Sequence, residues 1–158
     1  MSVFNQLEIL GVMLVAGALS ALIGFEREVK GKPAGLRTHI LVGSAAALIV
    51  SIGPELVNFF EPSTDPGSLN VDPTRVIQAI VIAIGFIGGG AVLKNEDKME
   101  VKHLTTAASI LFSATIGILV AIHLWWVATG AALIVVVVNY TLRILERRYI
   151  KHSNYKGD

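Results

Sequence analysis

The sequence has 158 residues, of which 53% are hydrophobic and only 16% are charged, and its mean hydropathy is +0.66. These values exclude an ordinary soluble domain and predict an integral membrane protein. The absence of cysteine excludes disulfides, thiolate metal sites and cysteine nucleophiles, and a formal net charge of +1 gives no reason to expect a nucleic-acid partner.

Windows of roughly 17–20 residues without a charge predict five helices that cross a lipid bilayer. In chain order they cover about residues 9–25, 38–58, 76–93, 104–122 and 124–142. The last two form one uncharged stretch that is too long for a single crossing, so we expect a tight hairpin at about residues 121–125, around His123. The predicted fold is an all-α, polytopic five-helix bundle over residues 1–145, followed by a basic cytoplasmic tail at 146–158.

The basic residues are divided unevenly between the two predicted sides of the membrane. Twelve of the 13 fall on one side and only Arg75 falls on the other. Because cytoplasmic loops carry the excess of Lys and Arg, we expect the N-terminus outside and the C-terminus in the cytoplasm. We expect no cleaved signal peptide, since the first apolar run is preceded by Glu8 and ends in Glu-Arg-Glu.

Small residues at steps of four predict where the helices approach closely, because membrane helices associate through such faces. The fifth helix is bulky and β-branched at 133–138 and is expected at a peripheral, lipid-facing position. Packing is the first interpretation, with a polar pathway along Thr105, Ser109 and Ser113 as the alternative; a spare face would also allow a homo-oligomer. The stripes are Ala16, Ser20 and Gly24; Gly43, Ala47 and Ser51; Gly85 and Gly89; and Thr105, Ser109, Ser113 and Gly117.

The first charged turn, GFEREVKGKPAGLRTH at 24–39, lies directly after the first predicted helix. Carboxylates near lipid need partners, so we expect Glu26 and Glu28 to pair with Arg37 across the turn. The simpler alternative is a solvated basic hairpin that only sets the topology.

The second and third motif regions carry helix-start signals and a glycine cluster. Asp72-Pro73 predicts an N-cap followed by proline at the first helical position. Arg75 is expected to have an anionic partner such as Asp72, Glu55 or Glu61, either as a local pair with Asp72 or as part of an outer-face site with it. The glycines at 85–90 allow very close helix contact or an unwound stretch. With Thr105 and Thr106 at the same depth, we expect one cytoplasmic-facing polar cluster formed by all three regions.

The strings GFEREVKGKPAGLRTH at 24–39, DPTRVIQAIVIAIGFIGGG at 72–90 and LTTAASILFSATIG at 104–117 resemble the three signature blocks of the MgtC/SapB family of bacterial inner-membrane proteins. The resemblance implies a five-helix membrane domain, a link to growth at low magnesium and to survival in macrophages (virulence), and, for some members, binding and restraint of the F-type ATP synthase. The candidate functional residues are Glu26, Arg27, Glu28, Arg37, Thr38, His39, Asp72, Arg75, Gly85, Gly88, Gly89, Gly90, Thr105 and Thr106.

The chain departs from the family pattern at several positions. His103 stands where the family usually has glycine, Gly89 where alanine is usual, and Phe112 where tryptophan is usual. Longer members carry a soluble C-terminal domain, whereas only about sixteen residues follow the last predicted helix here. The resemblance therefore does not carry functions of that domain over to this chain.

Three classes of function compete at this point. We favour a non-enzymatic regulator that binds other membrane proteins, over a magnesium or other cation transporter, which would need carboxylates deep in a span. An enzyme ranks third, because the histidines show neither ligand spacing nor a triad arrangement. No cofactor and no metal site are expected.

Overall fold

The structure is a computed structural model that describes residues 2–60, 72–95 and 100–145. Its helices supply five segments that are long and apolar enough to cross a membrane, which confirms the all-α, polytopic fold. The expected basic tail at 146–158 lies outside the described residues. The helices are α1 (Val3–Val29), α2 (Leu36–Ser51), α3 (Gly53–Phe60), α4 (Pro73–Ala91), α5 (Leu104–Ala121) and α6 (Trp125–Leu145), where α2 and α3 together form one segment.

The second membrane segment is divided into α2 and α3 by a short break. Ile52 closes α2 with a bond from its N–H to Leu48 O of 3.0 Å, and α3 begins at Gly53. Pro54 has no N–H to donate, so the helical ladder cannot run through this point without interruption.

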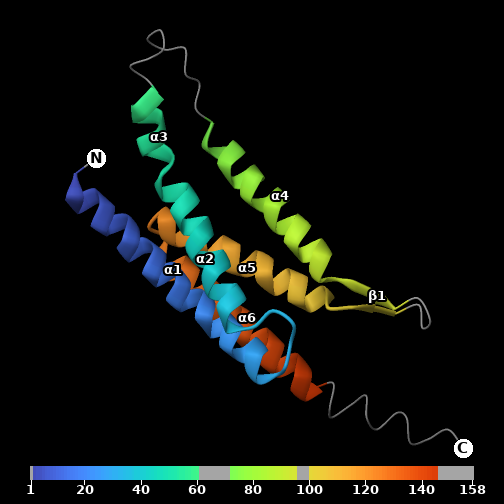
Figure 1. Ribbon diagram of the computed structural model, residues 1–158. Helices are drawn as coiled ribbons and strands as arrows, with labels where there is room; N and C mark the ends of the chain where they lie inside the picture. The colour runs from blue at the N-terminus through green and yellow to red at the C-terminus, as the bar shows by residue number, and fades with distance from the viewer. Residues whose placement is uncertain (1, 61–71, 96–99, 146–158) are drawn as a thin grey trace, which may run out of the picture.

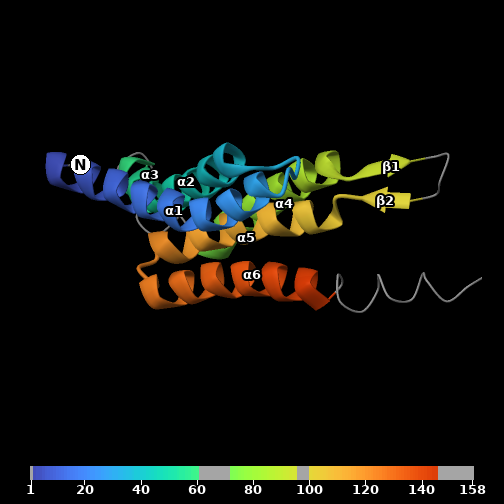
Figure 2. The same ribbon diagram turned by 90° about the horizontal axis from the view of Figure 1, so that it is seen from below.

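Helix α5 lies in the middle of the bundle and packs against α1, α2, α4 and α6. Half of its residues are buried, more than in any other helix of the described chain. Helix α6 forms a separate outer layer beside α1 and α5 (Figure 2), as its bulky sequence predicts. It contacts them through Ala128, Ala132 and Val135, and the two alanines are a small-residue step that the sequence reading missed.

Helices α1, α2 and α5 meet at backbone distance. A Cβ atom built on Gly43 would overlap the Ser20 hydroxyl, and one built on Gly117 would overlap Gly43 O. Only residues without a Cβ fit such a crossing. The predicted packing stripes are buried on these three helices except at Ser51, which is half-buried, and Thr105, which is exposed.

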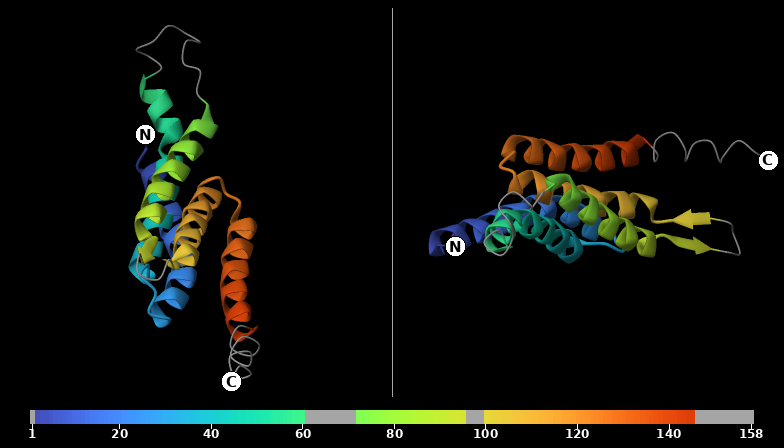
Figure 3. Two further views of the ribbon diagram at one scale, coloured as in Figure 1. Left: turned by 90° about the vertical axis from the view of Figure 1, so that its right-hand side faces the viewer. Right: turned by 90° about the horizontal axis from the view of Figure 1, so that it is seen from above.

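The bundle has two distinct ends (Figures 1 and 3). At the basic end lie the α1–α2 turn, the start of α5, the end of α6 and a two-stranded hairpin, β1 (Leu93–Asn95) with β2 (Glu100–Lys102), in which Leu93 pairs with Lys102. At the amino end lie the start of α1, helix α3 and the α5–α6 turn, as Figure 1 shows. That turn contains His123 at φ 60°, so the predicted hairpin is confirmed.

His103, which replaces the usual family glycine, also has a left-handed backbone with φ 69°. Glycine adopts this conformation without a steric cost, whereas in a residue with a Cβ the Cβ lies too close to a backbone carbonyl oxygen and raises the free energy. The structure thus gives a physical reason for glycine at this position.

Candidate functional site

Arg27 is a buried cation near the last turn of α1. Its side chain is 4% exposed, and its Nη2 donates to Thr106 Oγ1 at 2.7 Å. Its Nε is buried without a hydrogen-bond partner, and the ion pairs among the described residues do not include it. A guanidinium taken out of water without a carboxylate is costly. Thr106, its one acceptor among the described residues, therefore matters for stability.

His39 joins the first turn of α2 to α5. Its Nδ1 lies 2.7 Å from Gly35 O, and its Nε2 lies 3.1 Å from Ser109 Oγ. Because a carbonyl oxygen can only accept, Nδ1 carries a proton. The Ser109 hydroxyl also lies 2.8 Å from Thr106 O and has one proton to give. When the imidazole is neutral, the Ser109 hydroxyl can donate its proton to His39 Nε2 or to Thr106 O, but not to both. An imidazolium would donate from Nδ1 to Gly35 O and from Nε2 to Ser109 Oγ, which would leave the hydroxyl proton for Thr106 O.

The polar side chains continue from this point toward the middle of the bundle. Ser20 Oγ donates a long bond of 3.5 Å to Ser113 O, and Ser113 Oγ is buried without a partner. We call this set the buried polar line, and its members are Ser20, Arg27, His39, Thr106, Ser109 and Ser113.

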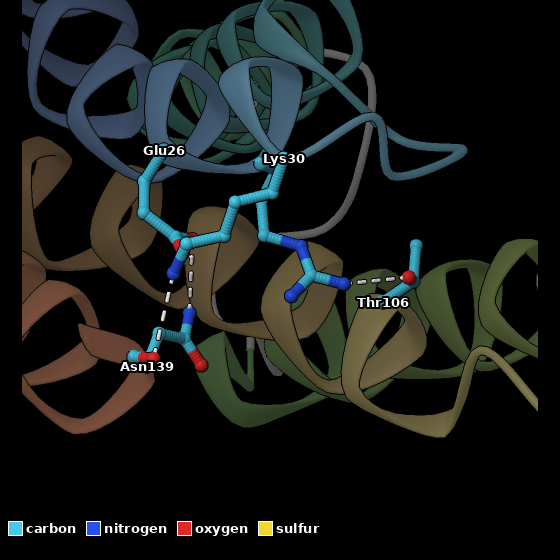
Figure 4. A network of polar contacts seen from close by, with 5 residues as sticks. Glu26, Lys30, Thr106 and Asn139 are labelled. Atoms are coloured by element: carbon cyan, nitrogen blue, oxygen red, sulfur yellow. Dashed lines mark hydrogen bonds and ion pairs between the residues drawn. The ribbon is translucent and has the colours of Figure 1, made fainter. Parts of the chain in front are cut away.

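Glu26 points toward α6, away from Arg27. It forms an ion pair with Lys30, and its Oε2 accepts from Asn139 Nδ2 at 3.3 Å (Figure 4). Lys30 Nζ also lies 3.4 Å from Asn139 O. Asn139 was missed in the sequence reading, although it is the one amide side chain of α6. These contacts fix the end of α6 to the end of α1.

The expected pairing of Glu26 and Glu28 with Arg37 is wrong. Glu26 bonds to Lys30, one turn further along its own helix, and Glu28 Oε2 accepts the N–H of Leu36 at 2.6 Å. Glu28 thereby supplies the cap that Gly35, the N-cap of α2, cannot provide from its own side chain. Arg37 is exposed and Thr38 half-buried, so both lie apart from the buried polar line.

The glycine cluster at the end of α4 is divided between two faces. Gly88 is buried, and a Cβ there would lie 3.3 Å from Ala107 Cβ on α5. A Cβ on Gly85, Gly89 or Gly90 would meet nothing within 4 Å. The predicted Gly85–Gly89 stripe is therefore not a contact within the described chain, and alanine, the usual family residue at position 89, would fit without a clash.

The remaining predicted residues do not join one cluster. Asp72 Oδ1 accepts from Thr74 N at 2.9 Å, which confirms the predicted N-cap, and Asp72 Oδ2 lies 3.7 Å from Arg75 Nε in an exposed local pair. This pair lies at the amino end, far from Arg27, and Thr105 is exposed. The single cluster expected from all three regions is thus reduced to Arg27, His39 and Thr106.

The arrangement supports hydrogen bonding and charge burial. Within residues 2–60, 72–95 and 100–145, no group of three or more His, Asp or Glu side chains is placed to hold a metal ion. The site is best described as a buried polar contact among three helices at the basic end of the bundle.

Five membrane-spanning segments around this contact define a multi-pass membrane protein. The sequence model of the MgtC family matches residues 13–148, and the chain belongs to this family. It is 31% identical to YhiD of Escherichia coli K12 over 87% of this chain and 64% of that protein. It is 35% identical to MgtC of Salmonella typhimurium LT2, over 86% of this chain and 53% of that protein. It is 36% identical to slr0014 of Synechocystis, over 89% and 54%.

The chain thus spans between about half and two thirds of the length of these curated relatives. Their bacterial origin is consistent with the inner membrane as the location of this multi-pass protein. No solved structure matches the chain.

Proposed function

We propose that this chain is a non-enzymatic membrane protein that supports bacterial adaptation to low magnesium and intracellular survival by binding another membrane protein. The F-type ATP synthase is the partner that we infer from the family resemblance. The N-terminus outside and the C-terminus in the cytoplasm remain our prediction for the orientation, since twelve of the 13 basic residues favour it.

The observation that carries the proposal is the open glycine face of α4. A Cβ at Gly85 or Gly89 would have no neighbour within 4 Å among the described residues, and both glycines border a groove of about 300 Å³ between α4 and α5. The groove walls are apolar, and on α5 they include Ala107 and Leu111. A helix of another protein can approach such a face at backbone distance, which is how membrane helices associate.

The test is affinity purification of the tagged full chain from bacterial membranes, comparing Gly89→Leu with Ile87→Leu. Both sites are exposed on α4, but only the first change places a new side chain on the glycine face. We expect Gly89→Leu to lose both ATP synthase co-purification and support of growth at low magnesium, while Ile87→Leu keeps both. Equal recovery of ATP synthase with the two variants would overturn the proposal.

A cation transporter is the second candidate, and the printed name of one relative, “Putative magnesium transporter YhiD”, favours it. Against it, the buried polar line carries a cation, a histidine and hydroxyls and no carboxylate. Magnesium typically takes one or two carboxylates with its waters. Magnesium flux into proteoliposomes containing the purified chain, without any partner protein, would support the transporter instead.

A further inference from the structure

A large cavity opens at the amino end of the bundle. It has a volume of about 660 Å³ and lies between α1, the α2–α3 break, the start of α4 and the end of α5. Small-molecule sites in proteins have volumes of roughly 300–1,000 Å³ and mostly apolar walls. The apolar wall here includes Val12, Val50, Val76, Ile77, Ile118 and Ala121.

Two of the polar side chains of this cavity are acidic. Glu8 of α1 and Glu55 of α3 both line it, and no Lys or Arg side chain does so among the described residues. The ion pairs of the described chain involve other carboxylates, namely those of Glu26 and Asp72. The cavity thus holds two carboxylates, and no Lys or Arg of the described residues lines it as a countercharge.

A further polar atom at the cavity lacks a partner. Ser51, at the break between α2 and α3, lines the cavity, and its Oγ is buried without a hydrogen-bond partner among the described residues. A buried hydroxyl without a partner costs free energy that a ligand or water can recover. Asn5 and His123 are the other polar side chains at the cavity.

The shape and chemistry of the cavity select one class of ligand. A bare divalent metal ion does not suit it, because no group of three or more His, Asp or Glu side chains is placed to hold one among the described residues, and a hydrated ion would leave the large apolar wall uncovered. An anion would face two carboxylates. A long apolar chain suits the apolar wall of the cavity, and a positively charged head group suits the carboxylates of Glu8 and Glu55.

We propose that this cavity binds an amphiphile with a single apolar chain and a cationic ammonium head. Glu8 and Glu55 hold the ammonium group, and Val12, Ile77 and Ile118 contact the chain. The same chemistry has two sources, the ammonium head group of a membrane lipid and a free alkylamine. The site lies at the amino end, away from the α4–α5 groove, so the proposal stands or falls separately from ATP synthase binding.

The test uses the purified full chain in a neutral maltoside detergent. The probe is dodecyltrimethylammonium, and its binding is counted by native mass spectrometry at increasing probe concentration. We expect saturable binding of one probe molecule, and dodecanol, with the same chain and no charge, to bind at least about tenfold more weakly, equivalent to about 1.4 kcal/mol.

Two matched pairs of variants separate charge from volume. Glu8→Gln with Glu55→Gln should weaken the probe about tenfold or more, whereas Glu28→Gln, at the basic end, should leave its affinity unchanged. Gly53→Leu should abolish binding because Gly53 lines the cavity, while Gly11→Leu should not. A Cβ on either glycine meets nothing within 4 Å, so both variants should fold.

The outcomes divide clearly. The proposal would be overturned if dodecanol bound as tightly as the ammonium probe. It would also be overturned if the probe bound equally to the parent and to the Glu8/Glu55 variant, or if probe binding did not saturate. Displacement of the probe by lysophosphatidylethanolamine, but not by lysophosphatidylglycerol, would support a lipid head group as the source. Displacement by alkylamines alone would support a free amine.

Discussion

Replacing Gly117 with alanine tests the close packing of α1, α2 and α5 most directly. The new Cβ would overlap Gly43 O and would lie 3.0 Å from Ala46 Cβ and 3.1 Å from Ala47 N. Carbon atoms normally pack at about 3.5–4.0 Å. Two of these three neighbours are backbone atoms, so the helices themselves must separate to admit the methyl group.

The expected loss of stability in Gly117→Ala is estimated by comparison with Gly89→Ala. Alanine gains about 1 kcal/mol of helix propensity over glycine in a helix interior, and this gain largely cancels when the two variants are compared. What remains is the overpacking cost at position 117, about 1–3 kcal/mol, because a Cβ at Gly89 meets nothing within 4 Å. For a chain of this size that corresponds to a melting temperature roughly 2–12 °C lower for Gly117→Ala than for Gly89→Ala.

The assay is thermal unfolding of the purified variants in one detergent, followed by circular dichroism. Gly89→Ala should melt at or slightly above the temperature of the parent protein. If Gly117→Ala is as stable as Gly89→Ala, the three helices do not meet at backbone distance and the packing described above is wrong.

Three further predictions follow from the site and the ends of the bundle. Thr106→Val should lower the free energy of unfolding by about 1.5–3 kcal/mol, because the buried guanidinium loses its acceptor; Thr105→Val, at an exposed site, should stay within about 0.5 kcal/mol of the parent. The Thr74 hydroxyl and amide hold the pKa of Asp72 below its usual value of 3.8, so the cap of α4 is present above that value and is lost as the pH falls through the lowered pKa. Protection of the Thr74 amide from hydrogen exchange should fall with acid in the parent and be insensitive to acid in Asp72→Asn. A cysteine at Lys32, in a chain without native cysteine, should react with an impermeant thiol reagent only after the cells are permeabilised, and labelling of intact cells would reverse the predicted orientation.

The candidate site was only partly predictable. The sequence reading identified Arg27, His39 and Thr106 through the family motif, but it assigned the wrong partner to Glu26. A carboxylate one turn before a lysine pairs within its own helix as readily as across a turn, and that choice depends on which neighbour takes the other oxygen. Here the neighbour is Asn139, and its contact with Glu26 depends on how α6 packs against α1 in the tertiary structure.

The sequence by itself determined the five membrane segments, the hairpin at His123 and the cap at Asp72. Each of these follows from local physics: the length of an apolar run against the thickness of lipid, or the chemistry of one helix terminus. The face that each helix turns to its neighbours was decided only by the tertiary structure. Helix α4 is apolar and rich in glycine on more than one side, so its pattern allowed either Gly88 or Gly89 to be the contact. Contact with Ala107 on α5 selected Gly88, because lipid and protein interiors are equally apolar and only the shape of the neighbouring helix distinguishes one small residue from the next.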